Sequence, residues 1–332
     1  MKTRITFFDT KPYDEASFNI HNKNYKFDIC YYKGHLNKDN VVLTKGSNAV
    51  CCFVNAVIDA EVIDRLVENN VGLIALRCAG FNNVDLRAAK GRIKIVRVPA
   101  YSPYAVAEHT LALMFTLNRK THKAYSRTRD GNFTLNGLMG FDMNGKIAGI
   151  IGTGKIARIL MTTLKAMGMS VLAYDPYPDD KFASECGIKY TTLDELYKNS
   201  DIISLHCPLT KETEYIINKD TIAKMKDGVM LINTGRGKLI DTNALIRGLK
   251  SKKVGFAGLD VYEEEGEYFF EDHSNYVIDD DTLARLLSFN NVIVTSHQAF
   301  FTKEAMENIA DTTLQNIKDF VDGEELVNEV AL

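Results

Sequence analysis

Three small residues, Gly152, Gly154 and Ala157, have the spacing of a phosphate-binding turn. They follow an apolar run at residues 147–151, typical of a buried parallel strand, and they precede apolar residues at helical spacing. In such a turn the first glycine permits a tight bend, and the second lets the backbone approach a pyrophosphate at the helix N-terminus. The small third residue allows the helix to pack closely on the strand. This order of strand, small residues and helix predicts a dinucleotide site.

Asp175 indicates which dinucleotide binds. It ends a second apolar segment, residues 170–174, and lies 21 residues after Gly154. A carboxylate at this position accepts hydrogen bonds from the adenosine ribose and repels a 2′-phosphate. The sequence therefore predicts NAD rather than NADP. The alternative to a dinucleotide site as a whole is a glycine turn in another kind of α/β protein.

Polar residues follow four later strand-like runs, where an open α/β sheet binds its ligands. Arg236, Glu265 and His297 lie in three of these segments. Arginine grips a carboxylate with two parallel hydrogen bonds, and histidine exchanges a proton near neutral pH. A carboxylate beside the histidine favours the imidazolium. Together these side chains predict hydride transfer to an α-keto acid beside a nicotinamide.

Each of these residues also has a structural interpretation. Arg236 fits the start of a helix, the acidic run 263–265 fits a solvated surface, and His297 alone fits a structural role. Their joint occurrence at successive strand ends favours chemistry. The remaining histidines are interpreted as structural: His21, His35, His109, His122, His206 and His273.

The composition is typical of a cytoplasmic enzyme with two domains. The chain has 332 residues, 45% of them hydrophobic, which is enough for two separate cores. Its formal charge of −3 gives no reason to expect nucleic acid or an anionic membrane as a partner. No segment has transmembrane length, and the N-terminus leads into a strand-like run rather than a signal peptide. The six cysteines lack disulfide or zinc spacing and predict reduced thiols.

Strand-like and helical segments alternate along the chain, which predicts two α/β halves with parallel sheets. The expected strands of the first half are residues 4–8, 27–31, 49–55, 73–77 and 93–98. Helical segments at 59–69, 84–90 and 105–118 follow, and the polar stretch 127–144, with three glycines, is expected to form a loop or an arm. The expected strands of the second half are residues 147–151, 171–174, 202–205, 229–233, 255–259 and 292–295. This half fits a doubly wound nucleotide domain.

The chain resembles the NAD-dependent D-2-hydroxyacid dehydrogenase family over nearly its whole length. The resemblance lies in the fingerprint, the Arg236 turn and the acidic run, together with the motifs at residues 77–85, 98–103, 204–210 and 296–300. Residues 268–274 resemble an insertion typical of the branch that acts on D-lactate. Two departures are mild: Ala157 replaces the usual third glycine, and Gly235 stands where serine or alanine is commoner.

The resemblance assigns roles by position. It makes His297 the acid/base, Glu265 its partner and Arg236 the residue that binds the substrate carboxylate and polarises its carbonyl. The other implied substrate-binding residues are Cys78, Ala79 and Gly80, through their backbone, and Tyr101. The implied cofactor-binding residues are Gly152, Gly154, Lys155, Ile156, Asp175, Cys207, Pro208, Thr213, Thr234, Gly235, Arg236 and Asp260. No metal is implied.

The resemblance also implies an α/β fold with two Rossmann-like or flavodoxin-like parallel-sheet domains and an active site in the cleft between them. Residues 1–100 and 300–332 would form the substrate-binding domain, and residues 101–299 the NAD-binding domain. The helix at 303–320 would return to the first half. A homodimer or homotetramer is expected, because family members commonly exchange the helix after Pro103 and the following arm.

The expected reaction is reversible reduction of pyruvate to D-lactate by NADH. One alternative is a related dehydrogenase for a larger 2-keto acid or glyoxylate. Another is a corepressor-type binding protein that senses NADH, against which stands the intact set of Arg236, Glu265 and His297.

Overall fold

The computed structural model describes residues 2–331, without the side chain of Glu267, and divides into two compact units. The first consists of Met1–Ser102 and Phe301–Leu332, and the second of Pro103–Phe300. Each unit contains one sheet in which all paired strands are parallel. This architecture confirms the predicted α/β fold class.

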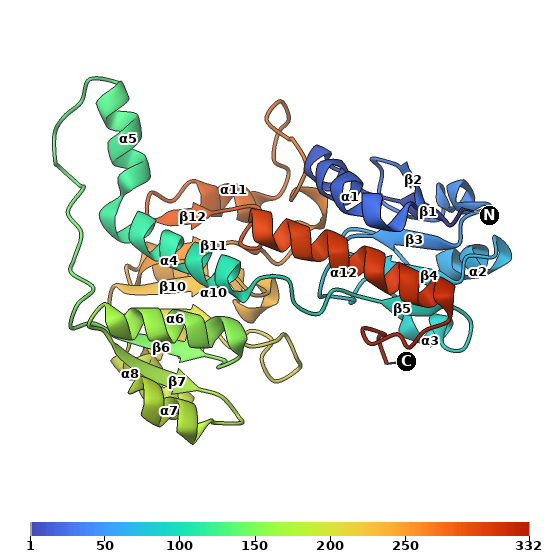
Figure 1. The fold of residues 1–332 in the computed structure, drawn as a ribbon. Helices are drawn as coiled ribbons and strands as arrows, with labels where there is room; N and C mark the ends of the chain where they lie inside the picture. Colours follow the sequence, from blue (N-terminus) through green and yellow to red (C-terminus); the bar gives the residue numbers. More distant parts are fainter. Residues whose placement is uncertain (1, 332) are drawn as a thin grey trace. The chain divides into compact units, whose positions relative to one another are not determined.

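The sheet of the first unit has the strand order β2-β1-β3-β4-β5, the flavodoxin-like order that reverses between β1 and β3. Its strands are β1 (Arg4–Phe7), β2 (Asp28–Tyr31), β3 (Ala49–Cys52), β4 (Leu73–Leu76) and β5 (Lys94–Val96). Helices α1 (Pro12–Tyr25) and α12 (Lys303–Asp322) lie side by side (Figure 1), and α12 packs on β4. The approach is close, because a Cβ on Gly72 would lie 2.6 Å from the Phe320 ring. The shorter helices are η1 (Val41–Thr44), α2 (Ala60–Glu68) and α3 (Leu86–Ala89).

The sheet of the second unit has the order β12-β11-β10-β9-β6-β7-β8. Its strands are β6 (Ile147–Ile151), β7 (Ser170–Tyr174), β8 (Lys189–Tyr190), β9 (Ile202–Leu205), β10 (Val229–Asn233), β11 (Val254–Leu259) and β12 (Val292–Val294). The six expected strands are present. The seventh, β8, has two residues, too few for an apolar pattern to show. The order reverses between β6 and β9, where a doubly wound sheet binds its ligand.

Helices cover both faces of this sheet. On one face lie α4 (Pro103–Arg119) and α6 (Lys155–Ala166), and on the other α8 (Leu193–Asn199), α9 (Lys219–Lys224), α10 (Thr242–Lys250) and α11 (Asp281–Leu287). Strand β10 shows why: Met230 and Ile232 join the core under α4 and α6, while Leu231 joins the opposite core. The remaining helices are α5 (Thr121–Arg129), α7 (Asp180–Cys186), η2 (Gly237–Leu239) and η3 (Glu265–Glu267).

A long connection runs from α5 to β6 and has no helix or strand between residues 130 and 146. Figure 1 shows it as an extended segment, in agreement with the arm that the sequence predicts. Phe133, Leu135 and Met139 are 76%, 81% and 88% exposed. Across residues 2–331, no helix combines the length and apolar character needed to cross a membrane.

Candidate active site

The turn after β6 has the shape that a pyrophosphate requires. Gly152 has a φ of +89°, and a Cβ there would lie 2.5 Å from the backbone nitrogen of Cys207, so only glycine fits. Gly154 begins α6 without a side-chain cap, and a Cβ placed on it has no neighbouring atom within 4 Å. The space beside Gly154 is therefore open, and a helix N-terminus without a side-chain cap suits an anion. Ala157 is fully buried, as the close packing of α6 requires.

Asp175 lies at the end of β7, beside this turn. Its Oδ2 accepts hydrogen bonds from the backbone nitrogen of Thr153 at 2.8 Å and from Thr153 Oγ1 at 3.0 Å. Its Oδ1 accepts one from the backbone nitrogen of Tyr177 at 2.9 Å. The carboxylate is thus fixed next to the phosphate-binding turn, where an adenosine ribose would need it.

The other residues predicted to bind the cofactor lie near strand ends of the second unit. Lys155 and Ile156 begin α6, while Cys207 and Pro208 follow β9. Burial raises the pKa of the Cys207 thiol to about 11, which keeps it neutral. Thr213 Oγ1 closes the loop after β9 by donating to the Pro208 carbonyl at 2.6 Å.

The segment after β10 carries two more of these residues. Thr234 Oγ1 lies 3.0 Å from Thr110 Oγ1 of α4, so this strand end is tied to the helix that covers it. Gly235 donates its backbone N–H to Asn233 Oδ1 at 3.0 Å and bends the chain toward Arg236. The strands β10, β9, β6 and β7 are neighbours in the sheet, so the segments that follow them lie along the same edge of the sheet.

His297 and Glu265 are in direct contact. His297 Nδ1 lies 2.7 Å from Glu265 Oε2, and both side chains are about four-fifths buried. Glu265 Oε1 accepts a hydrogen bond from the backbone nitrogen of Tyr262 at 3.0 Å, which fixes the carboxylate. An ionised carboxylate only accepts, so it holds the proton of His297 on Nδ1 and leaves Nε2 for a substrate.

The turn that carries His297 is strained and is held by Asp260. His297 has a φ of +53°, a region unusual for a residue with a side chain. Asp260, fully buried at the end of β11, accepts hydrogen bonds from Thr295 Oγ1, the Gln298 nitrogen and the Ala299 nitrogen at 2.5, 2.9 and 2.8 Å. Its own carbonyl accepts the N–H of His297 at 2.7 Å. Asp260 thus determines where the imidazole lies.

The charge of Asp260 is stabilised from a second direction. His109 Nε2 of α4 lies 3.4 Å from Asp260 Oδ1 and 3.2 Å from Thr295 Oγ1. Burial alone raises the pKa of the Asp260 carboxyl, but the hydrogen bonds and the neighbouring histidine lower it more, so the net pKa lies below its usual value. Asp260 therefore stays ionised as an acceptor at neutral pH.

Arg236 lies in the turn after β10. Its Nη1 donates to the carbonyl of Gly235 at 2.8 Å, and Asn233 Nδ2 donates to the carbonyl of Arg236 at 2.9 Å. The next residue, Gly237, packs so closely that a Cβ would lie 1.9 Å from the carbonyl oxygen of Tyr262. The arginine turn and the segment that fixes Glu265 are therefore in contact through Tyr262.

The predicted substrate residues of the first unit follow β4 and β5. Arg97 Nη1 donates to the carbonyl of Ala79 at 2.8 Å, and Cys78 Sγ lies 3.3 Å from the carbonyl of Gly80. These contacts hold the turn 78–80 through its carbonyl groups. The backbone of Tyr101 is bound by Asn308 Nδ2 of α12 at 2.7 Å.

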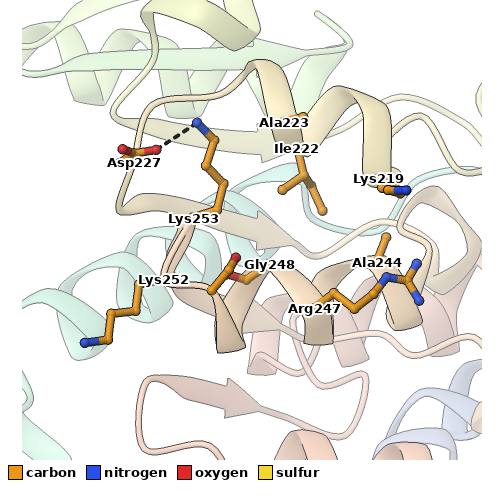
Figure 2. A pocket seen from close by; sticks show the side chains of 10 residues that line it. Lys219, Ile222, Ala223, Asp227, Ala244, Arg247, Gly248, Lys252 and Lys253 are labelled. Atoms are coloured by element: carbon orange, nitrogen blue, oxygen red, sulfur yellow. Dashed lines mark hydrogen bonds and ion pairs between the residues drawn. The ribbon is translucent and has the colours of Figure 1, made fainter.

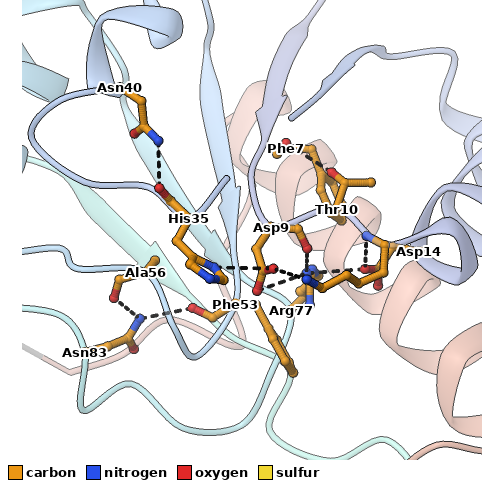
Figure 3. Close-up of polar contacts among 11 residues, drawn as sticks. Phe7, Asp9, Thr10, Asp14, His35, Asn40, Phe53, Ala56, Arg77 and Asn83 are labelled. Carbon is orange, nitrogen blue, oxygen red and sulfur yellow. Dashed lines mark hydrogen bonds and ion pairs between the residues drawn. The ribbon is translucent and has the colours of Figure 1, made fainter. Parts of the chain in front are cut away.

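A buried charged cluster lies directly before this turn (Figure 3). Arg77 Nη2 is 3.3 Å from Asp14 Oδ2 and also binds the backbone carbonyl of Asp9, and its guanidinium lies 4.2 Å from the centre of the Phe53 ring. His35 Nδ1 lies 3.3 Å from Asp9 Oδ1. Burial raises the pKa of Asp9, but His35 and Arg77 lower it below its usual value; for Asp14 burial prevails and raises the pKa. The cluster anchors the chain at the start of the turn.

A hollow of about 700 Å³ lies elsewhere in the second unit, between α9 and α10 (Figure 2). Its lining residues include Lys219, Arg247, Lys252 and Lys253, and Lys253 Nζ pairs with Asp227 at 2.8 Å. None of the predicted site residues lines it.

Sequence reasoning missed several residues of this site. Thr153 occupies the variable position between the two glycines, the sequence predicts only a structural role for His109, and it predicts no role for Thr295 or Tyr262. His109 contacts Asp260 and Thr295, more than a hundred positions away, and Thr153 contacts Asp175 across a whole strand–helix–strand unit, so no local pattern identifies these two residues. Tyr262 contacts Glu265 only three residues later, but through its backbone nitrogen, which no side-chain pattern reveals. Only the strand-end position of Thr295 offered a signal.

Comparisons with known proteins show the family to which the chain is similar. Residues 111–299 match the family described as D-isomer specific 2-hydroxyacid dehydrogenase, NAD binding domain. Over 328 residues the chain is 51% identical to a 2-hydroxyacid dehydrogenase homolog of Haemophilus influenzae, covering 98% of this chain and 99% of the relative. It is 49% identical over 328 residues to the D-lactate dehydrogenase of Escherichia coli, again with 98% and 99% covered. The apo structure of D-lactate dehydrogenase from Escherichia coli is similar with a TM-score of 0.92 and 46% identity, covering 99% of this chain and all of that one.

Proposed function

The chain belongs to the D-isomer specific 2-hydroxyacid dehydrogenase family and is an NAD-binding oxidoreductase, and we propose that within this family it interconverts pyruvate and D-lactate. The contact that most supports dehydrogenase chemistry is the 2.7 Å bond between His297 Nδ1 and Glu265 Oε2. It provides an oriented acid/base beside the Arg236 turn. The names of the Escherichia coli relative and structure support lactate as the substrate.

In the proposed reaction His297 donates and accepts the proton. Because Glu265 binds Nδ1, the proton that the substrate receives comes from Nε2 of the imidazolium and goes to the carbonyl oxygen of pyruvate. Loss of this proton leaves a neutral imidazole, which takes the proton back when lactate is oxidised. NADH, when bound, supplies the hydride to the carbonyl carbon.

Arg236 and the turn 78–80 would bind the substrate carboxylate. A guanidinium offers two parallel N–H donors, and the backbone amides of Ala79 and Gly80 offer further donors. Because the carbonyl of Ala79 is already bound by Arg97, the turn is preorganised for this role. Arg236 also stabilises negative charge that develops on the carbonyl oxygen.

The test is NADH oxidation, followed at the nicotinamide absorbance band, with pyruvate, 2-ketobutyrate, phenylpyruvate and glyoxylate. We expect the highest kcat/KM with pyruvate, and in the reverse direction activity with D-lactate but not L-lactate. A higher kcat/KM with a larger 2-keto acid or with glyoxylate would assign the chain to that substrate instead. This second candidate is favoured by relatives that are named only as 2-hydroxyacid dehydrogenase homologs. Absence of any turnover would favour an NADH-binding regulator.

We further propose that a second copy of the chain covers α4, α5 and the arm. Phe115 of α4 is 42% exposed, and Tyr125 of α5 is 64% exposed. With Phe133, Leu135 and Met139 they form a run of exposed apolar side chains that a monomer rarely presents to water.

The reduced thiols expected from the sequence fit a cytoplasmic location.

A further inference from the structure

We propose that Thr153 and Tyr190 are positioning residues for cofactor discrimination, because their hydroxyl groups fix the Asp175 carboxylate in the orientation that accepts the adenosine ribose of NAD. The inference rests on NAD binding and not on the proposed substrate.

The three side chains form one hydrogen-bond chain from three segments. Tyr190 is the last residue of β8, Thr153 lies in the turn after β6, and Asp175 follows β7. Tyr190 Oη donates to Thr153 Oγ1 at 3.0 Å, and Thr153 Oγ1 donates to Asp175 Oδ2 at 3.0 Å. The pairing of Ala173 with Tyr190 brings β8 into place beside β7.

The direction of this chain follows from the chemistry of its groups. An ionised carboxylate has no hydrogen to give, so the single hydroxyl hydrogen of Thr153 goes to Asp175. The Thr153 oxygen is then an acceptor toward Tyr190, and the phenol must be the donor. Tyr190 therefore acts on Asp175 only through Thr153.

The two oxygens of Asp175 are left with different tasks. Oδ2 accepts both the N–H and the hydroxyl of Thr153, at 2.8 and 3.0 Å, and is fully used. Among residues 2–331, Oδ1 accepts a hydrogen bond from the N–H of Tyr177 alone, at 2.9 Å, and retains a lone pair for a ribose hydroxyl. Because Oδ2 is held twice, the carboxylate is fixed in one orientation and would keep it when a dinucleotide binds. Discrimination then depends on orientation as well as on charge.

The experiment measures the dissociation constants of NADH and NADPH by nicotinamide fluorescence, without a keto acid, for Thr153→Val, Tyr190→Phe and the double variant. Valine keeps the shape and the backbone N–H of Thr153 but removes the hydroxyl. We expect Thr153→Val to raise the Kd for NADH about three- to tenfold, with NADPH binding unchanged or tighter. Tyr190→Phe should shift the preference in the same direction by a smaller factor.

The double variant gives the sharpest result, because Tyr190 acts through Thr153. It should bind both cofactors as Thr153→Val does, with no added loss. Effects of the two substitutions that multiply would overturn the proposal. A preference for NADH that stays within twofold of the parent in Thr153→Val, while Asp175→Ala loses it, would overturn it as well.

Two further variants serve as controls. Thr153→Ser keeps the hydroxyl and should retain the parent preference for NADH. If Thr153→Val does not fold, the proposal is still tested by comparing Tyr190→Phe, which should lose part of the preference, with Thr153→Ser, which should keep it. Tyr177→Phe removes a hydroxyl from a residue that is 86% exposed and binds Asp175 only through its backbone, so it should change nothing. Loss of preference in Thr153→Ser would contradict the proposal. Because no keto acid is present, the outcome is independent of the proposed reaction.

Discussion

Glu265 bridges the backbone nitrogen of Tyr262 and the imidazole of His297, with its two oxygens at 3.0 and 2.7 Å from these partners. One oxygen fixes the carboxylate to the chain that leaves β11, and the other orients the ring. Asp260, which directly follows β11, also binds the backbone of the turn after β12 that carries His297. The orientation of His297 therefore depends on the backbone geometry at the ends of β11 and β12. Substitutions at these residues should separate orientation from charge.

Glu265→Gln should lower kcat in both directions of the reaction. The amide offers one acceptor oxygen where the carboxylate offers two, so the backbone nitrogen of Tyr262 and His297 Nδ1 cannot both keep their present partner. We expect a decrease in kcat of about ten- to hundredfold, with the Kd for NADH little changed. Steady-state kinetics and NADH fluorescence check this. A kcat like that of the parent would show that His297 is oriented without Glu265.

Arg236→Lys should raise the KM for pyruvate about ten- to hundredfold while the Kd for NADH changes little. The substitution keeps the charge but loses the planar pair of donors that a carboxylate needs. Steady-state kinetics and NADH fluorescence provide the measurements. Arg247→Lys on α10, whose side chain is 59% exposed, is the matched control and should behave as the parent. An unchanged KM would transfer the carboxylate anchor to the turn 78–80.

Asp260→Asn should lower both stability and turnover. An amide offers one acceptor oxygen where the carboxylate offers two, so at least one N–H of the strained turn loses its partner. We expect a loss of about 1–3 kcal/mol in the free energy of unfolding and a decrease in kcat of up to about a hundredfold. Urea unfolding and kcat are to be compared with those of Asp279→Asn, an exposed control. Parent-like kcat would mean that the turn holds His297 without Asp260.

His206 should make the protein sensitive to mild acid. Burial lowers its pKa to about 4 from an ordinary value of 6.5. Between these values the unfolded chain binds a proton that the folded protein does not, so stability falls as the pH drops, by about 3 kcal/mol at most. Above pH 6.5 both states are neutral, and below about 4 both are charged, so the dependence ends there.

The measurement is urea unfolding at pH 7.5 and pH 5 for the parent and for His206→Gln. The variant should lose less stability on acidification than the parent, whatever its stability at pH 7.5. Equal losses in the two proteins would assign the acid sensitivity to other groups.

Replacing Phe133, Leu135 and Met139 of the arm by serine should dissociate the proposed oligomer. These side chains are exposed in the single chain, and their burial against a second copy would be driven by the hydrophobic effect. Sedimentation velocity should show a decrease in mass toward 37.2 kDa. Exchange of Tyr276 and Val277, exposed apolar residues outside the arm, for serine is the control. A parent protein that already sediments as a monomer would refute the interface.

The sequence was sufficient for those features that depend on local pattern. The glycine turn, Asp175 and the strands that precede Arg236 and His297 are encoded by short segments, so their fold and order are predictable. The partners that hold them are not, because His109 reaches Asp260 from a helix on the face of the sheet. That contact depends on packing between residues more than a hundred positions apart.

The first unit shows the same limit. Asp9, Asp14, His35 and Arg77 come from three segments, which follow β1, β2 and β4, and they meet because these parallel strands end at the same edge of the sheet. Their charges are scattered in the sequence, where each resembles an ordinary surface residue. The helix at 303–322 has a readable apolar pattern, yet its place on the first sheet was implied only by the resemblance to a family.

The contact of Phe320 with Gly72 has a consequence for synthesis on the ribosome. The first unit combines residues 1–102 with residues 301–332, so the face of its sheet that α12 covers stays exposed until residues 303–322 have been translated. The second unit is continuous and can complete all its strands before then. The unit whose strands emerge first is thus the one that matures last, and a nascent chain holds a finished nucleotide domain beside an unfinished partner.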